Sequence, residues 1–427
     1  MNNDFFVDSK NYGDLLKKCC ISATVVIIYF LLQRIQCYGI NNATVKLVQQ
    51  SAFIRLFDTF SGGNFSNLPI GALGIAPFVT SSIIIQLLST DMGNSWYDFS
   101  IKSFVEWNYQ GSVGQKKKDI LTSLLSIPLA IATCLTMLAT INKQSLQSTH
   151  NTIYANVAAP YLVVLQMTIA SVFLTILCLK LNKQGIIQNI SLIIMSGIFI
   201  KLPKQISTSF ISMSKSDSIM GLFILFVVVS VVIFSMRIAY RIPLHFANEL
   251  QVENDSYIPV TWNPGGMMSI IFASLLLGAF QAWGNILPVS KQAHIILNSL
   301  FNIDTNIGLI LYGTLIIIFS FIYAYIQYNP VQIGLKLRQY GGTIEDYRDE
   351  NEGLLYFKRI LNCYAVYGAL LMIVVAIMPQ AIAHAIHGLN TPLFKYMGSS
   401  IMIISSALFE LKMRLYAEVV NINYSSK

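Results

Sequence analysis

Apolar runs long enough to cross a bilayer alternate with short polar segments along the whole chain. A crossing needs about 20 consecutive apolar residues in a helix. The pattern therefore predicts ten transmembrane helices. The fifth and tenth are short, and Gly197 and Gly398 weaken them as isolated helices. The expected spans have approximate limits 19–37, 70–89, 120–141, 157–180, 186–203, 219–238, 266–284, 307–327, 360–380 and 397–412.

The polar stretch from Lys204 to Ser218 separates these spans into two groups of five. We therefore expect an all-α membrane protein with an N-terminal half over residues 1–205 and a C-terminal half over residues 206–427. The halves show no clear sequence repeat, although repeats in membrane proteins are often detectable only in structure.

Composition agrees with a surface that mostly faces lipid. Hydrophobic residues make up 54% of the chain and charged residues 11%, with a mean hydropathy of +0.59. A soluble domain carries roughly 25% charged residues. The first apolar run is too long for a typical cleavable signal and lacks a small-residue cleavage site, so we expect it to remain as a span.

The basic residues predict the orientation of the chain. A net charge of +8 can indicate nucleic acid as a partner, but in a membrane protein it more often reflects cytoplasmic loops rich in Lys and Arg. With a cytoplasmic N-terminus, 19 of the 28 basic residues fall in cytoplasmic segments and 9 outside. We expect a multi-pass protein of the cell membrane, with both termini cytoplasmic and no nucleic acid bound.

Two of the cytoplasmic segments are long and polar, over about 239–265 and 329–359. Both are bounded by Pro or Gly, so we expect them to project into water as loops. The first holds Arg241 and the second holds Arg348, which are candidates for contact with a soluble partner.

The sequence lacks the patterns of the common catalytic and metal sites. None of its six cysteines stands in a C-x-x-C pair, and no H-E-x-x-H or spanning G-x-S-x-G occurs. No G-x-x-x-x-G-K-[ST] loop is present to hold ATP phosphates. We expect no enzyme activity, no metal and no cofactor, and any driving energy must come from a partner.

A broken helix precedes the second span. A short aromatic stretch over about 54–68 is interrupted by a glycine pair, and non-helical backbone at membrane depth survives only inside protein or beside a water-filled cavity. This arrangement indicates a pore or transport site, or else a re-entrant loop that only fills space. The residues of the stretch that matter most are Phe57, Phe60, Gly62, Gly63 and Phe65.

Further motifs follow in a fixed order along the chain. Together with the broken helix and the second span, they closely resemble the SecY/Sec61 protein-conducting channel family. The motifs are Gly114-Gln115-Lys116-Lys117-Lys118, Gly185-Ile186-Ile187-Gln188-Asn189, Arg241-Ile242-Pro243, Tyr257-Ile258-Pro259, Asn263 through Gly266, Phe319-Ser320-Phe321, and Gln327-Tyr328-Asn329-Pro330.

The resemblance implies ten helices in two halves around a central pore, with residues 54–68 as a plug. It also implies a narrow ring of aliphatic side chains, which dewets when the pore is empty and so blocks ions. All of the matching positions are Ile or Val, and two pairs are spaced four residues apart on one helical face. The ring positions are Ile75, Val79, Ile194, Ile198, Ile271 and Ile403.

The same resemblance implies a lateral gate to lipid, where spans two and three part from spans seven and eight. The gate would involve Ile83, Gln86, Leu87 and Ser274, together with Ile271 of the ring. Gln86 is polar within an apolar run. It either bonds across the closed seam or pairs with a neighbouring backbone carbonyl.

The family also implies partners. A SecA-type motor ATPase would dock on the loops that carry Arg241 and Arg348, and a small SecE-like membrane subunit would bind the channel. The transported client would be an unfolded preprotein, with membrane lipid at the gate.

Some positions depart from the family pattern. Ser269 stands where a proline is expected, the glycines around Gly185 are reduced, and residues 91–103 have no counterpart. These changes resemble a divergent accessory SecY of Gram-positive bacteria, which exports glycosylated serine-rich adhesins. The alternatives are a housekeeping SecY for general secretion and a ten-span secondary transporter, although transporters usually place ionisable groups at the midplane.

Overall fold

The computed structural model describes most of the chain as long helices. The described residues are 9–38, 68–90, 101–147, 159–181, 192–199, 214–246, 257–286, 305–344, 350–385 and 392–425, with a few isolated positions. Besides an unlabelled helical segment at 192–199, the helices are α1 Ser9–Arg34, α4 Ala76–Ser89, α5 Lys102–Tyr109, α6 Gly111–Gln147, α7 Ala159–Leu181, α9 Lys215–Arg237, α10 Met268–Ile286, α12 Asn306–Gln327, α13 Pro330–Tyr340, α14 Glu350–Ala385 and α15 Pro392–Ser425.

Every predicted span overlaps a helix in the part of the chain that the structure describes. Within the described residues, five helical stretches are both long and apolar enough to cross a membrane, in α6, α7, α9, α12–α13 and α14. Two more, Ala76–Ser89 and Met268–Phe280, are apolar but shorter. The remaining spans fall on α1, residues 192–199 and α15.

The second span begins later than its hydropathy predicts. The sequence predicted a start at about residue 70, but residues 70–75 form turns and α4 starts at Ala76. Gly74 takes a φ of +52°, a conformation that glycine adopts without strain, and a proline occupies the first turn of α4. The turn is tied to α1, because the backbone N–H of Gly71 donates to the carbonyl of Leu32 at 3.1 Å.

Three other helices extend well beyond their predicted spans. α6 has 37 residues, α14 has 36 and α15 has 34. Hydropathy marks only the apolar part of a helix, whereas the backbone ladder continues into the polar flanks. The helix that carries the short tenth span is therefore longer than the span itself.

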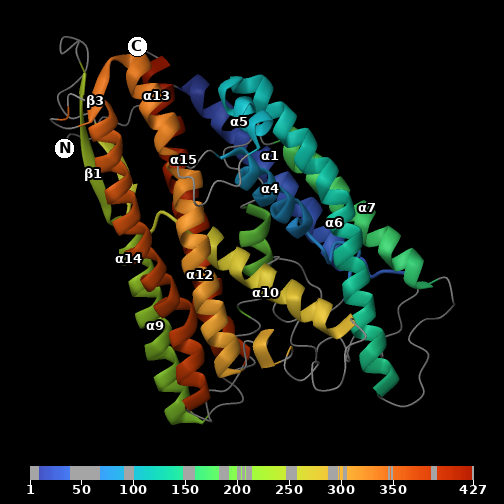
Figure 1. Cartoon of the computed structure of the whole chain (residues 1–427). Helices are drawn as coiled ribbons and strands as arrows, with labels where there is room; N and C mark the ends of the chain where they lie inside the picture. The colour runs from blue at the N-terminus through green and yellow to red at the C-terminus, as the bar shows by residue number, and fades with distance from the viewer. Residues whose placement is uncertain are drawn as a thin grey trace.

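The helices form two groups with α10 between them (Figure 1). In the first group α6 packs against α4, α5 and α7, and α1 packs against α7. In the second group α14 packs against α9, α12 and α15. α10 contacts α12 of the second group and α6 of the first.

The two polar loops contain a small sheet that the prediction of plain loops missed. Strands β1 Ala239–Phe246, β2 Tyr257–Thr261 and β3 Gly342–Ile344 are ordered β2-β1-β3, and both pairings are antiparallel. The sheet lies at the same end of the molecule as the start of α1 and the end of α15 (Figure 1). Residues 240–246 and 257–261 place Tyr240, Ile242, Leu244 and Phe246, and Ile258 and Val260, at every second position, which is the period of a half-buried strand.

The prolines of these strands occupy positions that a sheet tolerates. The backbone N–H of Trp262 donates to the carbonyl of Ile238, so these two residues form a hydrogen-bonded pair. In an antiparallel ladder, hydrogen-bonded pairs alternate with pairs that exchange no hydrogen bond. By that alternation Pro243 and Pro259 fall in pairs that exchange none, where a missing N–H costs no ladder bond. Two of the sequence motifs are cross-strand partners, Arg241-Ile242-Pro243 in β1 and Tyr257-Ile258-Pro259 in β2.

The sheet is anchored to α14 by its inward face. Ile242, Val260 and Ile344, one from each strand, are buried in one cluster with Phe357 and Leu361 of α14. Burying a side chain of this size stabilises a fold by about 1.5–3 kcal/mol. The polar loops are therefore held against the helices by apolar contacts.

Candidate functional site

The six aliphatic side chains predicted to form a ring are all buried. They come from α4 and the turn before it, residues 192–199, α10 and α15. None is more than 4% exposed, and all six belong to a single cluster of buried apolar side chains. The structure therefore brings together residues that lie more than 300 positions apart in the chain.

Ile75 and Val79 are positioned by the turn that starts α4. Ile75 caps the helix, and its carbonyl accepts the backbone N–H groups of Phe78 and Val79, each at 3.1 Å. Because the preceding turn is bonded to α1, the first turn of α4 is fixed against the first helix. Ile75 and Val79 are thus oriented by backbone bonds as well as by packing.

Ile271 is positioned by the turn that starts α10. Gly266 takes a φ of +53°, and its N–H donates to the carbonyl of Asn263. The Ser269 hydroxyl donates to the carbonyl of Gly266 at 3.1 Å, so the side chain in the place of the expected proline is buried and bonded. One turn further on, Ile271 N–H donates to the carbonyl of Met267.

This cluster offers neither charge nor hydrogen-bonding side chains at the six positions. An aliphatic constriction holds water poorly, and it can open around a passing chain without binding it strongly. We refer to Ile75, Val79, Ile194, Ile198, Ile271 and Ile403 as the waist.

A seam between the two helix groups runs beside the waist. α6 contacts α10, and α4 contacts α12, which are the helices on either side of the predicted lateral gate. Ile83 packs against the waist cluster, Gln86 and Leu87 are half-buried, and Ser274 is buried.

The polar side chains of the seam bond within their own helices. Gln86 donates to the Ser82 hydroxyl at 3.0 Å, one turn back in α4. This partner is neither of the two that the sequence left open. The Ser274 hydroxyl donates to the carbonyls of Ile270 and Ile271 at 2.8 and 2.9 Å. Within the part of the chain that the structure describes, the hydrogen bonds of these two side chains therefore do not cross the seam.

Arg241 lies on the exposed face of β1. Its guanidinium stands over the ring of Tyr257 in the neighbouring strand, 4.7 Å from the ring centroid. A cation over an aromatic face is attracted by the ring quadrupole, and the contact restrains the long side chain without removing it from water. Arg241 is thus exposed on the sheet and restrained by this contact. Arg348 lies outside the described residues.

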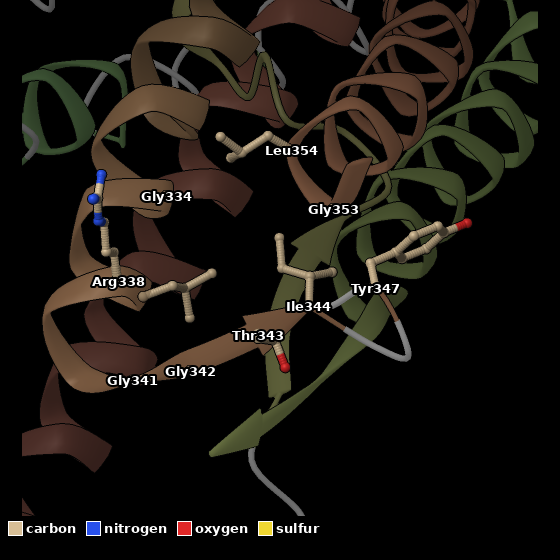
Figure 2. Close-up of a pocket in the computed structure, with 10 residues that line it drawn as sticks. Gly334, Arg338, Gly341, Gly342, Thr343, Ile344, Tyr347, Gly353 and Leu354 are labelled. Atoms are coloured by element: carbon tan, nitrogen blue, oxygen red, sulfur yellow. The ribbon is translucent and has the colours of Figure 1, made fainter. Parts of the chain in front are cut away.

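A shallow pocket of about 290 Å³ borders β3 (Figure 2). It is lined by α13, the turn at Gly341, β3 and the start of α14. Gly341 ends α13 with a φ of +65° and donates its N–H to the carbonyls of Arg338 and Leu337. The glycine pair of this loop is therefore a helix stop that turns the chain into the sheet.

The predicted plug cannot be placed. Phe57, Phe60, Gly62, Gly63 and Phe65 lie outside the described residues, as does everything from 39 to 67. The described chain resumes at Leu68, which is buried and has a φ of +51°.

The fold defines a multi-span helical membrane protein, and the six waist side chains lie in one buried apolar cluster to which both helix groups contribute.

Comparison with known proteins gives the family. The SecY family model matches residues 69–411. The chain is 27% identical over 431 residues to protein translocase subunit SecY 1 of Lactobacillus kefiranofaciens subsp. kefiranofaciens, covering 94% of each chain. It is 26% identical over 399 residues to SecY 2 of the same organism, covering 91% of this chain and 94% of the relative. The chain belongs to the SecY family, whose members here are protein translocase subunits.

Solved structures agree on the fold. A structure described as "The structure of a protein conducting channel" superposes with a TM-score of 0.65 at 18% identity, covering 97% of this chain and 94% of that one. The ten-helix architecture expected from the sequence is thus confirmed.

Proposed function

We propose that the chain is the channel subunit of a Sec-type preprotein translocase, which passes unfolded polypeptides across the cell membrane. The observation that carries the proposal is the waist. Six Ile and Val side chains from four segments are gathered in one buried cluster, to which both helix groups contribute. A seal of this kind excludes ions when empty and yields to an extended chain.

The seam supports a sideways exit to lipid for apolar segments of the client. It separates α4 and α6 from α10 and α12, and the bonds of Gln86 and Ser274 lie within their own helices. Parting the seam therefore breaks apolar contacts that lipid or an apolar client segment can replace. Residues 54–68 act as the plug below the waist in this proposal.

The sequence has no G-x-x-x-x-G-K-[ST] loop, and we infer a SecA-type motor as the energy source of the channel. Arg241, restrained over Tyr257, and Arg348 in the next cytoplasmic loop form the docking surface. A small SecE-like membrane subunit completes the complex, and both termini lie in the cytoplasm.

We place the chain in an accessory export system for glycosylated serine-rich adhesins. Support comes from its departures at positions where the family pattern is expected, such as Ser269 and the reduced glycines near Gly185. The SecY 1 and SecY 2 relatives match almost equally well, so identity alone does not distinguish accessory from housekeeping roles.

Depletion in the native host, combined with surface proteomics, tests the proposal. An accessory channel predicts normal growth, normal general secretion, and loss of one class of surface adhesin. Arrest of growth with accumulation of many precursors would instead identify a housekeeping channel. Purification of the complex should recover a SecA-type ATPase and a small membrane subunit, and recovery of neither would contradict the translocase assignment.

A further inference from the structure

The short helix α5 lies across the ends of the two helices that border the seam in the first group. It packs against both α4 and α6, and Figure 1 shows it at the same end of the molecule as the small sheet. One face of α5 is half-buried and carries Phe104, Val105, Trp107 and Asn108. Helix α5 is therefore placed where it can hold α4 and α6 together.

The end of α4 is capped from the segment that carries α5. The last four carbonyls of a helix have no N–H donor within that helix. The backbone N–H of Ile101, which precedes α5, donates to the carbonyl of Leu88 at 2.8 Å. The side-chain nitrogen of Asn108 donates to the carbonyl of Ser89, the last residue of α4. The last two carbonyls of α4 are thus bonded to this segment.

The start of α6 is joined to the same segment. Gly111 takes a φ of +58° and turns the chain from α5 into α6. Gly114, in the first turn of α6, lies so close to α5 that a Cβ there would overlap the carbonyl oxygen of Trp107. One turn later the ammonium group of Lys118 donates to the side-chain oxygen of Asn108. Backbone packing and one charged hydrogen bond therefore hold α6 against α5.

Asn108 is the residue at which these contacts meet. Its amide donates to α4 through the nitrogen and accepts from α6 through the oxygen. The amide is planar and the residue is half-buried, so the two partners are held at a fixed separation. A hydrogen bond to an ammonium group is roughly twice as strong as one between neutral groups. A single side chain therefore links the ends of two helices.

A second bond joins the same two helices further along them. The Ser81 hydroxyl of α4 donates to the carbonyl of Thr122 in α6 at 2.9 Å, and both residues are buried. By contrast Gln86 of α4 and Ser274 of α10, which lie at the seam, bond within their own helices. Polar bonds thus tie α4 to α6, while Ile83 of the seam packs against apolar side chains.

We propose that Asn108 is a positioning residue of the channel, which couples α4 to α6 so that the two helices move as one body when the seam parts. The inference rests on the proposed function and adds a residue outside the seam that governs how the seam opens. With the coupling intact, the contacts of α4 with α12 and of α6 with α10 break together. Without the coupling, either contact can break alone at a lower cost in free energy, because fewer contacts are lost.

Transport of two precursors tests the coupling. Asn108→Leu removes both bonds of the amide and leaves a side chain of similar size. The same client is given either its full signal sequence or one with fewer apolar residues. We expect the ratio of weak-signal to full-signal transport to rise about three- to tenfold, the effect of one or two net hydrogen bonds. A variant that is only less stable would transport both precursors more slowly by the same factor, and an unchanged ratio would overturn the coupling.

Two further variants assign the effect to the amide. Asn108→Asp keeps an acceptor for Lys118 but has no donor for the carbonyl of Ser89, so the ratio should rise here too. This variant provides the measurement if Asn108→Leu does not fold. Gln110→Leu is the matched control, because it removes an exposed bond from Lys117 on the same segment. An equal rise in the control would show that Asn108 has no particular role.

Spin-label distances in the assembled complex show which helices move. The six native cysteines are replaced, and pairs of labels are attached at Ile84→Cys of α4, Leu124→Cys of α6 and Ile318→Cys of α12, all at exposed positions. Distances are compared between the idle channel and a channel that holds a client arrested by a folded domain. With Asn108 present, we expect the α4–α12 distance to lengthen and the α4–α6 distance to stay constant. In Asn108→Leu the α4–α6 distance should change as well.

The outcomes separate the coupling from the proposed function. A longer α4–α12 distance in both backgrounds, with a constant α4–α6 distance in Asn108→Leu, would overturn the coupling and leave the lateral gate intact. An α4–α12 distance that does not respond to the client in either background would contradict the lateral gate and, with it, the coupling.

Discussion

Gly398 of α15 lies directly against the backbone carbonyl of Val375 in α14. The approach is so close that a Cβ on residue 398 would overlap that oxygen, and it would also lie 3.3 Å from the ring of Pro379. Pro379 stands four residues after Val375, so this carbonyl lacks its usual helical N–H donor. Because Gly398 has no side chain, its Cα hydrogens can face the carbonyl oxygen of Val375. Such a Cα–H···O contact is weak but favourable at helix interfaces.

Gly398→Ala should therefore destabilise the protein. The added methyl group forces α15 away from α14 and removes the contact, at a cost of about 1–3 kcal/mol. Thermal unfolding in detergent measures the effect. The matched control is Gly353→Ala near the start of α14, where the nearest atom would be 3.4 Å from the new Cβ. This control should be neutral or more stable by up to about 1 kcal/mol, because alanine favours helix. Equal effects at both positions would contradict the contact.

Polar substitutions in the waist should open the channel to ions. Ile75→Ser, Ile194→Ser and Ile271→Ser together replace dewetting side chains with hydroxyls that hold water, so conductance in planar bilayers should rise several-fold. Transport should also tolerate weaker signal sequences, because the closed state is destabilised. Ile318→Ser, on the exposed face of α12, is the control and should leave conductance unchanged. Unaltered conductance in the triple variant would count against the waist as a seal.

Charge reversal on the cytoplasmic loops should weaken docking of the motor. Arg241→Glu and Arg348→Glu place repulsion where the proposal expects attraction, so the association rate should fall on the order of several-fold at low salt and less at high salt. Surface plasmon resonance with the cognate ATPase measures the rates. Lys180→Glu makes the same charge change at the exposed end of α7 and is the control. If the two arginine variants and the Lys180→Glu control lose the same amount of binding, the arginines do not form the docking surface.

Tyr328, the residue that caps α12, bonds to Thr261 of the sheet, and removal of its hydroxyl should be costly. Tyr328→Phe deletes the hydroxyl that accepts the backbone N–H of Thr261 at 3.2 Å, leaving that N–H unpaired. We expect a loss of about 1–3 kcal/mol in the free energy of unfolding. Tyr325→Phe removes an exposed hydroxyl bond to Asn362 and should change stability by no more than about 0.5 kcal/mol. Comparable losses in the free energy of unfolding in both variants would show that the bond to Thr261 adds no particular stability.

Much of the site could be predicted because the waist residues fall at recognisable places in a known order of motifs. Ile75 and Ile271 can be identified from the motifs around them, and both side chains are buried. The role of Asn108 was not predicted, because nothing in one sequence reveals that a single amide bonds to two helices. The strand pairing of residues 239–246 with 257–261 was not predicted. The polar character of the whole segment 239–265 indicated a loop, and the alternation within the two short stretches was overlooked.

The sequence by itself determined the number of spans and the family. Each membrane-spanning segment must be long and apolar enough to cross the bilayer, and this requirement depends on its local composition alone. Only the tertiary structure decided which helices touch, where the two polar loops pair as strands, and why residue 398 must lack a side chain. Those features depend on distances between segments far apart in the chain, and hydropathy along the chain contains no such distances.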